Sequence, residues 1–317
     1  MKKLRRILVT VADLAQEQRG VLRRAASLAR ASGARIELFH AVTEPHFYSR
    51  GSGNGILDLQ ITPGESLRAA QECLARIARS RLLTGCRVEA VAVWEKPAHE
   101  AIIRHALATR ADLILSGTRS RGLASRLLLR HTDWELLRHA PMPVWLVKSE
   151  RTASKAVVLA AIDPLHANAK PTQLDPLILD AAQGMASLLK GVTHAFHAFM
   201  PLSITLAAGV GEPMAWDSRE LDADYAQRVS REFSRILRGT AIPTTRWHLR
   251  AGPIVPELTA CTNRVRATLL VMGAGSRARL DRLFIGNTAE RILDDVACDV
   301  LVVKPRGFKT PIKAKKT

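Results

Sequence analysis

The stretch that decides the fold runs from Ala267 to Pro305 and reads ATLLVMGAGSRARLDRLFIGNTAERILDDVACDVLVVKP. It opens on a short apolar run, residues 267–272, which is typical of a strand buried on both faces of a parallel sheet. Gly273 and Gly275 follow this run, and the absence of a Cβ lets the backbone turn there. The stretch therefore predicts, in order, a strand, a glycine turn, a basic loop, a helix and a second strand.

The predicted helix of this stretch is opened by the sequence Gly286-Asn287-Thr288. Asn287 or Thr288 can cap the free N–H groups of the first turn, and Glu290 lies near the positive end of the helix dipole. Free N–H groups beside a glycine turn and several arginines form a candidate phosphate site. The motif alone has low specificity, because most Gly-x-Gly turns after a strand simply connect two elements.

The same pattern occurs earlier in the chain, in residues 111–148, which read ADLILSGTRSRGLASRLLLRHTDWELLRHAPMPVWLVK. Gly117 and Gly273 are 156 positions apart, and so are Lys148 and Lys304. A constant offset through several predicted elements indicates an internal duplication, in which each half of the chain ends in this unit.

Length and composition agree with two globular domains. The 317 residues are enough for two domains of roughly 150 residues each, and we expect these at 1–150 and 155–305, followed by a basic tail at 306–317. The fractions of apolar residues, 47%, and charged residues, 24%, are ordinary for a soluble protein. No apolar run approaches the roughly 20 residues of a membrane span. Asp13 interrupts the apolar opening, which we interpret as a buried strand rather than a signal peptide.

The cysteines show no metal-binding or disulfide spacing. None forms a Cys-x-x-Cys pair or a Cys/His cluster, so we expect a cytoplasmic protein without a metal site. The four cysteines are Cys73, Cys86, Cys261 and Cys298.

The formal net charge is +18, which is compatible with attraction to nucleic acid, to anionic lipid or to a ligand that carries phosphate. A solvated basic surface explains it more simply, because the chain shows neither an aromatic-basic RNA motif nor a helix-turn-helix pattern. We therefore do not expect nucleic acid as a partner.

Predicted strands alternate with predicted helices along both halves, which indicates an α/β fold with a mainly parallel sheet. His40 lies near the end of a predicted strand, where such sheets present residues to a ligand, although a single histidine there is more often a packing residue. The predicted strands are 4–11, 34–42, 86–94, 111–116 and 143–147 in the first half, and 155–162, 192–199, 244–250, 267–272 and 299–303 in the second.

Four segments together resemble the tandem-type universal stress protein family, most closely its E type. They are TDWELLRHAPMPVWLVK at 132–148, VLAAIDP at 158–164, RAGP at 250–253 and GNTAERILDDVACDVLVVKP at 286–305. The resemblance covers both halves almost from end to end.

The resemblance implies an architecture. Each half would be a Rossmann-like domain of the adenine nucleotide alpha hydrolase type, with five parallel strands in the order 3-2-1-4-5. The two domains would associate through their last strands, 143–147 and 299–303, which gives an intramolecular pseudo-dimer. A homodimer of the whole chain is a further expectation, and the resemblance names no protein partner.

The resemblance also implies a nucleotide site in the second half, because nucleotide-binding members carry the motif G-2x-G-9x-G-(S/T). Ser276 replaces the second glycine of that motif and Asn287 replaces the final Ser/Thr, while Gly275 and Thr288 lie beside these positions and can substitute for them. Asp163 matches the acidic residue that contacts ribose. The candidate binding residues are Asp163, Met272, Gly273, Gly275, Ser276, Gly286, Asn287 and Thr288.

The first half departs further from the motif. Gly117 is retained, but Ser120, Arg130 and His131 replace the remaining positions, and Asp13 lies one residue late after its strand. The bulk of Arg130 obstructs the close approach of the backbone to a phosphate. We therefore expect the first half to be a degenerate, structural copy.

Two functions follow from these observations. The first is a cytoplasmic stress-response protein whose second half binds ATP, ADP or another anionic ligand, with Mg²⁺ present only together with a nucleotide. The alternative is an interaction scaffold that binds no nucleotide. We do not expect an enzyme, beyond weak ATP hydrolysis at most, because the sequence shows no catalytic base, nucleophile or metal cluster.

Overall fold

The computed structural model describes residues 4–15, 18–43, 62–118, 131–150, 155–165, 174–207, 218–274 and 287–314. These residues form two compact units. The first unit contains the described residues up to 150 together with 310–314, and the second contains those from 155 to 309. The C-terminal segment 310–314 therefore belongs to the first unit, although it follows the second unit in the chain.

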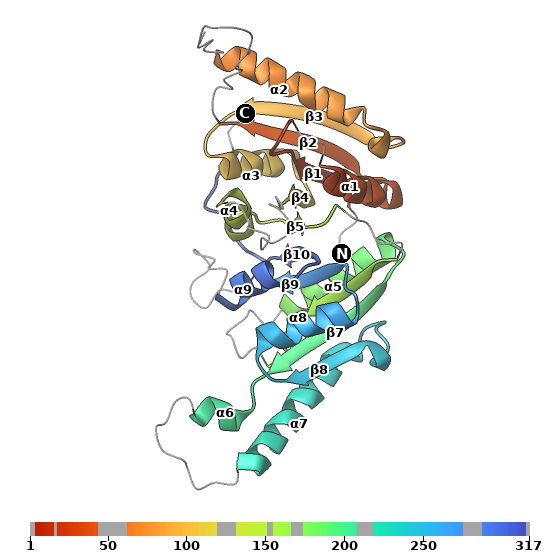
Figure 1. The fold of residues 1–317 in the computed structure, drawn as a ribbon, viewed down its shortest axis with the longest axis vertical. Coiled ribbons are helices and arrows are strands. Elements are labelled where there is room, and N and C mark those ends of the chain that lie inside the picture. Colours follow the sequence, from red (N-terminus) through yellow and green to blue (C-terminus); the bar gives the residue numbers. More distant parts are fainter. Residues whose placement is uncertain are drawn as a thin grey trace, which may run out of the picture. The chain divides into compact units, whose positions relative to one another are not determined.

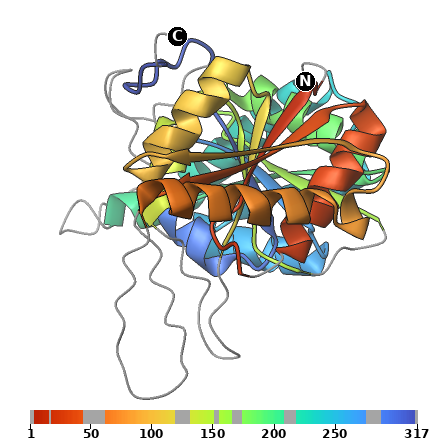
Figure 2. The same ribbon diagram turned by 90° about the horizontal axis from the view of Figure 1, so that it is seen from above.

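The first unit is built on five parallel strands in the order β3-β2-β1-β4-β5 (Figure 1). These strands are β1 Arg6–Thr10, β2 Arg35–Val42, β3 Arg87–Trp94, β4 Leu113–Gly117 and β5 Val144–Val147. The helices are α1 Arg19–Ser32, α2 Pro63–Ala78, α3 Ala98–Thr109 and α4 His131–His139, with a short 3₁₀ turn at Arg81–Leu83. Helices α1 and α2 cover one face of the sheet and α3 covers the other (Figure 2). This arrangement is the one that right-handed crossovers require.

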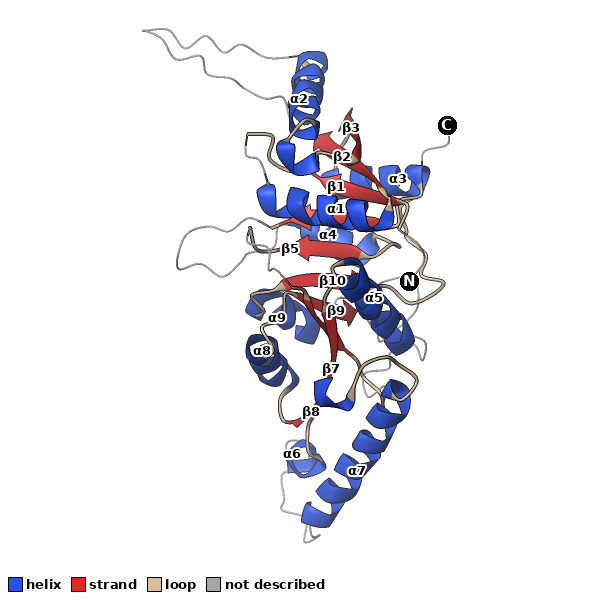
Figure 3. Ribbon diagram, turned by 90° about the vertical axis from the view of Figure 1, so that its right-hand side faces the viewer, coloured by secondary structure: helices blue, strands red, loops and turns tan. Residues whose placement is uncertain are grey.

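The second unit repeats this plan, with strands in the order β8-β7-β6-β9-β10, again all parallel. The strands are β6 Val157–Ala161, β7 Val192–Phe199, β8 Trp247–Ala251, β9 Leu269–Gly273 and β10 Asp299–Val303. The helices are α5 Leu174–Leu188, α6 Leu202–Ala207, α7 Ser218–Leu237, α8 Ile254–Arg264 and α9 Asn287–Asp295, with a 3₁₀ turn at Thr244–Arg246. Helices α5 and α7 lie on one side of the strands, and α8 and α9 on the other (Figure 3). Each half thus has the expected strand order 3-2-1-4-5.

The duplication extends to single residues. Arg110 and Arg266 follow α3 and α8, and both adopt left-handed backbone conformations, with φ of 55° and 53°. His40 and His197 are both buried near the ends of β2 and β7. The Nδ1 atom of His40 lies 2.6 Å from the carbonyl oxygen of Val11, and that of His197 lies 3.0 Å from the carbonyl oxygen of Ile162. Both histidines therefore fasten the second strand of a unit to the turn after the first strand.

The sequence did not predict helix α6, which lies between β7 and α7. Residues 202–207 form helix α6. The backbone N–H of Ser203 donates to Asp222 Oδ1 of α7 at 2.9 Å, and its hydroxyl donates to Asp222 Oδ2. A contact between residues so far apart in the chain leaves no mark in the local pattern, which explains why the helix was missed.

Gly191, which precedes β7, provides a direct test of the packing in the second unit. A Cβ on Gly191 would lie 2.1 Å from the carbonyl oxygen of Ala156 and 2.7 Å from the Cβ of Ala156. We expect Gly191→Ala to lower the free energy of unfolding by about 1–3 kcal/mol or more, because overpacking forces the backbone apart. Gly64→Ala in α2 is the matched control, because no heavy atom lies within 4 Å of that added Cβ. Urea denaturation of the full chain measures both, and equal stability of the two variants would contradict the observed packing.

Candidate functional site

Two buried carboxyl groups lie near the carboxyl end of β6. Asp163 is 5% exposed and Asp175, in the first turn of α5, is 1% exposed. The backbone N–H of Asp163 donates to Asp175 Oδ1 at 3.0 Å. The Oδ2 atom of Asp163 is buried and has no hydrogen-bond partner among the described residues. A buried acceptor without a donor is costly, so this oxygen is suited to receive a donor from a ligand, such as a hydroxyl group.

The end of β9 lies beside this carboxyl group, because β9 pairs with β6 in parallel, with Val271 opposite Ala160. Gly273 is the last residue of β9, and a Cβ there would lie 2.5 Å from the Cδ2 atom of Leu174. The glycine is therefore needed so that the first residue of α5 can pack onto the strand. Met272 is 7% exposed and adds apolar surface at the same edge.

The structure thus brings together three of the eight candidate residues, Asp163, Met272 and Gly273, at the carboxyl ends of adjacent strands. Helix α9 begins at Asn287, as expected, and Thr288 in its first turn is exposed. The side chain of Asn287 and the whole of Gly275, Ser276 and Gly286 lie outside the described residues. Their roles stay predictions.

The first unit has a corresponding edge with different chemistry. Gly117 ends β4, and a Cβ there would lie 2.8 Å from both Gln18 Oε1 and Val21 Cγ2. Gln18 is 156 positions before Leu174, so a polar amide occupies the place of an apolar side chain. Within the described part of the chain, Gln18 Oε1 is buried without a hydrogen-bond partner. The two glycines therefore keep the same packing role against different neighbours.

A buried hydrogen-bonded chain also distinguishes the first unit. The hydroxyl of Thr10 donates to Ser116 Oγ at 3.0 Å, and the hydroxyl of Ser116 donates to Asp133 Oδ1 at 2.8 Å. Asp133 is fully buried in the first turn of α4. Its carboxyl group occupies the positive end of that helix, where a phosphate would otherwise be stabilised. In the second unit the equivalent residue, 156 positions later, is Ala289. This acidic residue was not among the candidates from the sequence, although its place in the first turn of a helix is a recognisable signal.

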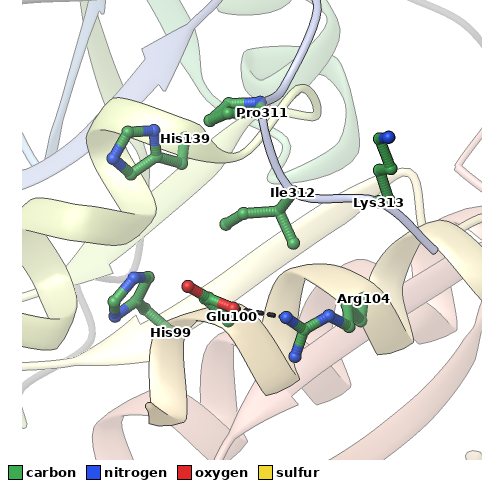
Figure 4. A pocket seen from close by; sticks show the side chains of 7 residues that line it. All are labelled: His99, Glu100, Arg104, His139, Pro311, Ile312 and Lys313. Atoms are coloured by element: carbon green, nitrogen blue, oxygen red, sulfur yellow. Dashed lines mark hydrogen bonds and ion pairs between the residues drawn. The ribbon is translucent and has the colours of Figure 1, made fainter. Parts of the chain in front are cut away.

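A pocket of about 370 Å³ lies elsewhere in the first unit and shares no residue with these edges (Figure 4). Its walls come from α3, α4 and the C-terminal segment. On α3, Arg104 is bonded to Glu95 and Glu100. On α4, the Nε2 atom of His139 lies 3.1 Å from Glu135 Oε2. Burial lowers the pKa of His99, and the nearby Glu135 and Glu100 partly oppose this shift. The lining residues are His99, Glu100, Arg104, His139, Pro311, Ile312 and Lys313.

Across the described ranges, no three His, Cys, Asp or Glu side chains are placed to hold a metal ion together. None of the helices in the described part of the chain is long and apolar enough to cross a membrane.

Both units are similar to known proteins. The model of the universal stress protein family matches residues 3–148 and 158–304. Universal stress protein E of Photorhabdus laumondii subsp. laumondii is 26% identical over 325 residues, which cover 98% of each chain. Universal stress protein E of Escherichia coli K12 is 25% identical over 321 residues, which cover 96% of each chain.

Solved structures show the same fold. A functionally unknown protein from Pseudomonas aeruginosa PAO1 has a TM-score of 0.65 and 25% identity, with 95% of this chain and 93% of that chain covered. A universal stress protein from Archaeoglobus fulgidus DSM 4304 has a TM-score of 0.63 at 18% identity, with 94% and 98% covered. At that identity, the second likeness concerns the fold alone.

Alanine substitutions of Asp163 and Asp175 should have different effects on the free energy of unfolding. Asp175→Ala removes the acceptor of the buried Asp163 N–H, so we expect a loss of about 1–3 kcal/mol in unfolding free energy. Asp163→Ala removes a carboxyl group whose buried Oδ2 has no partner among the described residues, so we expect unchanged or raised stability. Thermal and urea denaturation measure both variants. A larger loss for Asp163→Ala than for Asp175→Ala would show that the Asp163 carboxyl group is structural.

Proposed function

Because the chain belongs to the universal stress protein family, we propose that it is a cytoplasmic stress-response protein that binds ATP or ADP in its second half. The domains that we propose are 1–150 and 155–305, with a tail at 306–317, and the two family matches support these boundaries. We further propose that the domains associate through β5 and β10 as a pseudo-dimer within the chain.

The observation that carries the proposal is the buried Oδ2 atom of Asp163, which no described residue pairs with. A ribose offers hydroxyl donors, and a carboxylate oxygen that is buried at a strand end can accept from them. Met272 and Gly273 lie on the neighbouring strand, which places apolar surface and a residue without a Cβ beside the carboxyl group. The start of α9 at Asn287 would contribute N–H groups and the positive end of its dipole to the phosphates. A Mg²⁺ ion would enter only with the nucleotide.

We do not expect the first half to bind a nucleotide. Two structural features support this in addition to the substituted motif residues. The Asp133 carboxyl group is at the start of α4, where it competes with a phosphate for the helix terminus. Gln18 occupies the space over Gly117. The first half would then contribute stability and surface rather than a ligand site.

A nucleotide-free scaffold is the second candidate, and one observation favours it. The side chain of Leu174 fills the space over Gly273, so packing alone explains why that position is glycine. Under this alternative, the chain acts through its protein partners. Neither candidate includes catalysis, and we propose no enzymatic activity.

Restoring the family motif tests the proposal. The wild-type chain should bind ATP weakly, with a dissociation constant of roughly 0.1–1 mM, or about −4 to −5.5 kcal/mol. Ser276 limits the backbone conformations that bring N–H groups together, and Asn287 replaces a small hydroxyl group. The double variant Ser276→Gly/Asn287→Ser should therefore bind ATP more tightly, as measured by isothermal titration calorimetry on the full chain.

The control for this titration is Asp163→Asn, introduced into the double variant. Loss of the carboxylate acceptor should weaken ATP binding again, whereas Asp13→Asn in the first half should leave it unchanged. If the double variant binds ATP no better than the wild type, the loop is not a phosphate site and the scaffold candidate replaces our proposal.

A further inference from the structure

A pair of histidines bridges β7 and the neighbouring outer strand β8 of the second unit. The Nδ1 atom of His194 on β7 lies 2.9 Å from the Nε2 atom of His248 on β8. Their rings stack with centroids 5.2 Å apart and planes inclined by 10°. Only one of the two facing nitrogens can carry a hydrogen, so at least one of these rings is neutral in this arrangement.

The pair lies on the face of the sheet that α8 covers. Side chains alternate along a strand, and Trp247 packs against Phe233 of α7 on the opposite face. His248 and Arg250 therefore point toward the α8 side, and His194 lies on the same side because it alternates with Ala195, the register partner of Trp247. Helix α8 packs against β7 on this side.

Arginine side chains lie near this pair, and no carboxylate of the described residues pairs with them. Burial, His194, Arg250 and Arg264 lower the pKa of His248 to about 4. Burial and Arg246 also lower the pKa of His194. The Nε atom of Arg250 is buried and has no hydrogen-bond partner in the described part of the chain. Over the same residues, no carboxylate forms an ion pair with Arg246, Arg250 or Arg264.

At the equivalent place in the first unit, a carboxylate, that of Glu37, lies near the basic side chains. Glu37 is the third residue of β2, as His194 is of β7, and it is 3% exposed. Its Oε1 atom lies 2.9 Å from His105 Nε2, and its Oε2 atom lies 3.9 Å from Arg6. Burial raises the pKa of Glu37, but His105 and Arg6 outweigh this effect and lower it overall. The first unit therefore places a carboxylate among its cationic groups.

The second unit lacks that carboxylate and has additional positive charge. His194 replaces Glu37, and Cys261 of α8 stands where α3 has His105, 156 positions earlier. Arg250 of β8 pairs in register with Ala198 of β7. The equivalent pair in the first unit is Val93 of β3 and Ala41 of β2, so Arg250 stands where the first unit has a valine. Burial raises the pKa of the Cys261 thiol, Arg264 and Arg250 oppose this shift, and Glu257 of α8 adds to it. Glu257 pairs with no arginine among the described residues. An external anion would restore the balance that Glu37 provides in the first unit.

We propose that the edge cluster, defined as His194, His248, Arg250 and Arg264, binds an oxyanion of the phosphate type between β8 and α8. Arginine donates to such anions in a bidentate manner, and an imidazole N–H adds a further donor. Partial burial strengthens these interactions because water screens them less. The edge cluster shares no residue with the candidate nucleotide site, so this anion would be a second ligand.

The test uses inorganic phosphate and the full chain at constant ionic strength. Isothermal titration calorimetry should detect phosphate binding to the wild type. His194→Glu installs the carboxylate of the first unit, so it should raise the dissociation constant of phosphate at this site by at least about tenfold. The same substitution should raise the melting temperature in phosphate-free buffer, because it supplies the missing negative charge. Phosphate that binds at the nucleotide site would be unaffected by this change.

Arg250→Gln and Arg238→Gln form a matched pair, because each removes one arginine charge, and Arg238 is exposed on the surface. Arg250→Gln should weaken phosphate binding and Arg238→Gln should not. Should Arg250→Gln fail to fold, His194→Glu decides the question alone. The proposal is overturned if the wild type does not bind phosphate, or if His194→Glu binds it as tightly as the wild type.

Discussion

The central parallel strand of each unit is the constraint on which the rest of the structure depends. β1 is hydrogen-bonded on both sides, to β2 and β4, and β6 is bonded to β7 and β9 in the same way. Helices cover both faces of such a sheet, so its backbone groups can be satisfied only by neighbouring strands. Parallel pairing also places all carboxyl ends at one edge. Asp163, Met272 and Gly273 owe their common place at one edge to that alignment.

The two units show how far side-chain chemistry can diverge on one backbone plan. Packing positions have kept their roles, as with Gly117 and Gly273 against the starts of α1 and α5. Several charged positions have not kept their residue type. Asp133 is at a helix start where the second unit has an alanine, and Glu37 is at a strand position where the second unit has His194. The units therefore share a fold, while their charged side chains differ at equivalent places.

The sequence predicted the strands well, because buried parallel strands are short apolar runs and the duplication confirms each of them. The strand order followed from the resemblance to the family. Asp163 and Gly273, two candidates from the family motif, lie at one edge because β6 and β9 are parallel. Contacts between residues that are far apart in the chain were harder to predict from the sequence. Helix α6 depends on Asp222, and the place of residues 310–314 in the first unit depends on tertiary packing. The unpartnered oxygen of Asp163 and the histidine pair could not be predicted, because hydrogen bonding at a site depends on side-chain geometry.

Hydrogen exchange of the full chain with and without ATP, followed by mass spectrometry, tests the central claim most directly. That claim is that one fold occurs twice, but only its second copy accepts a nucleotide. The account predicts that ATP slows exchange in peptides that contain Asp163 and Gly273 and leaves those that contain Asp13 and Gly117 unchanged. Slower exchange around Gly117 and Asp133, with none around Asp163, would contradict it.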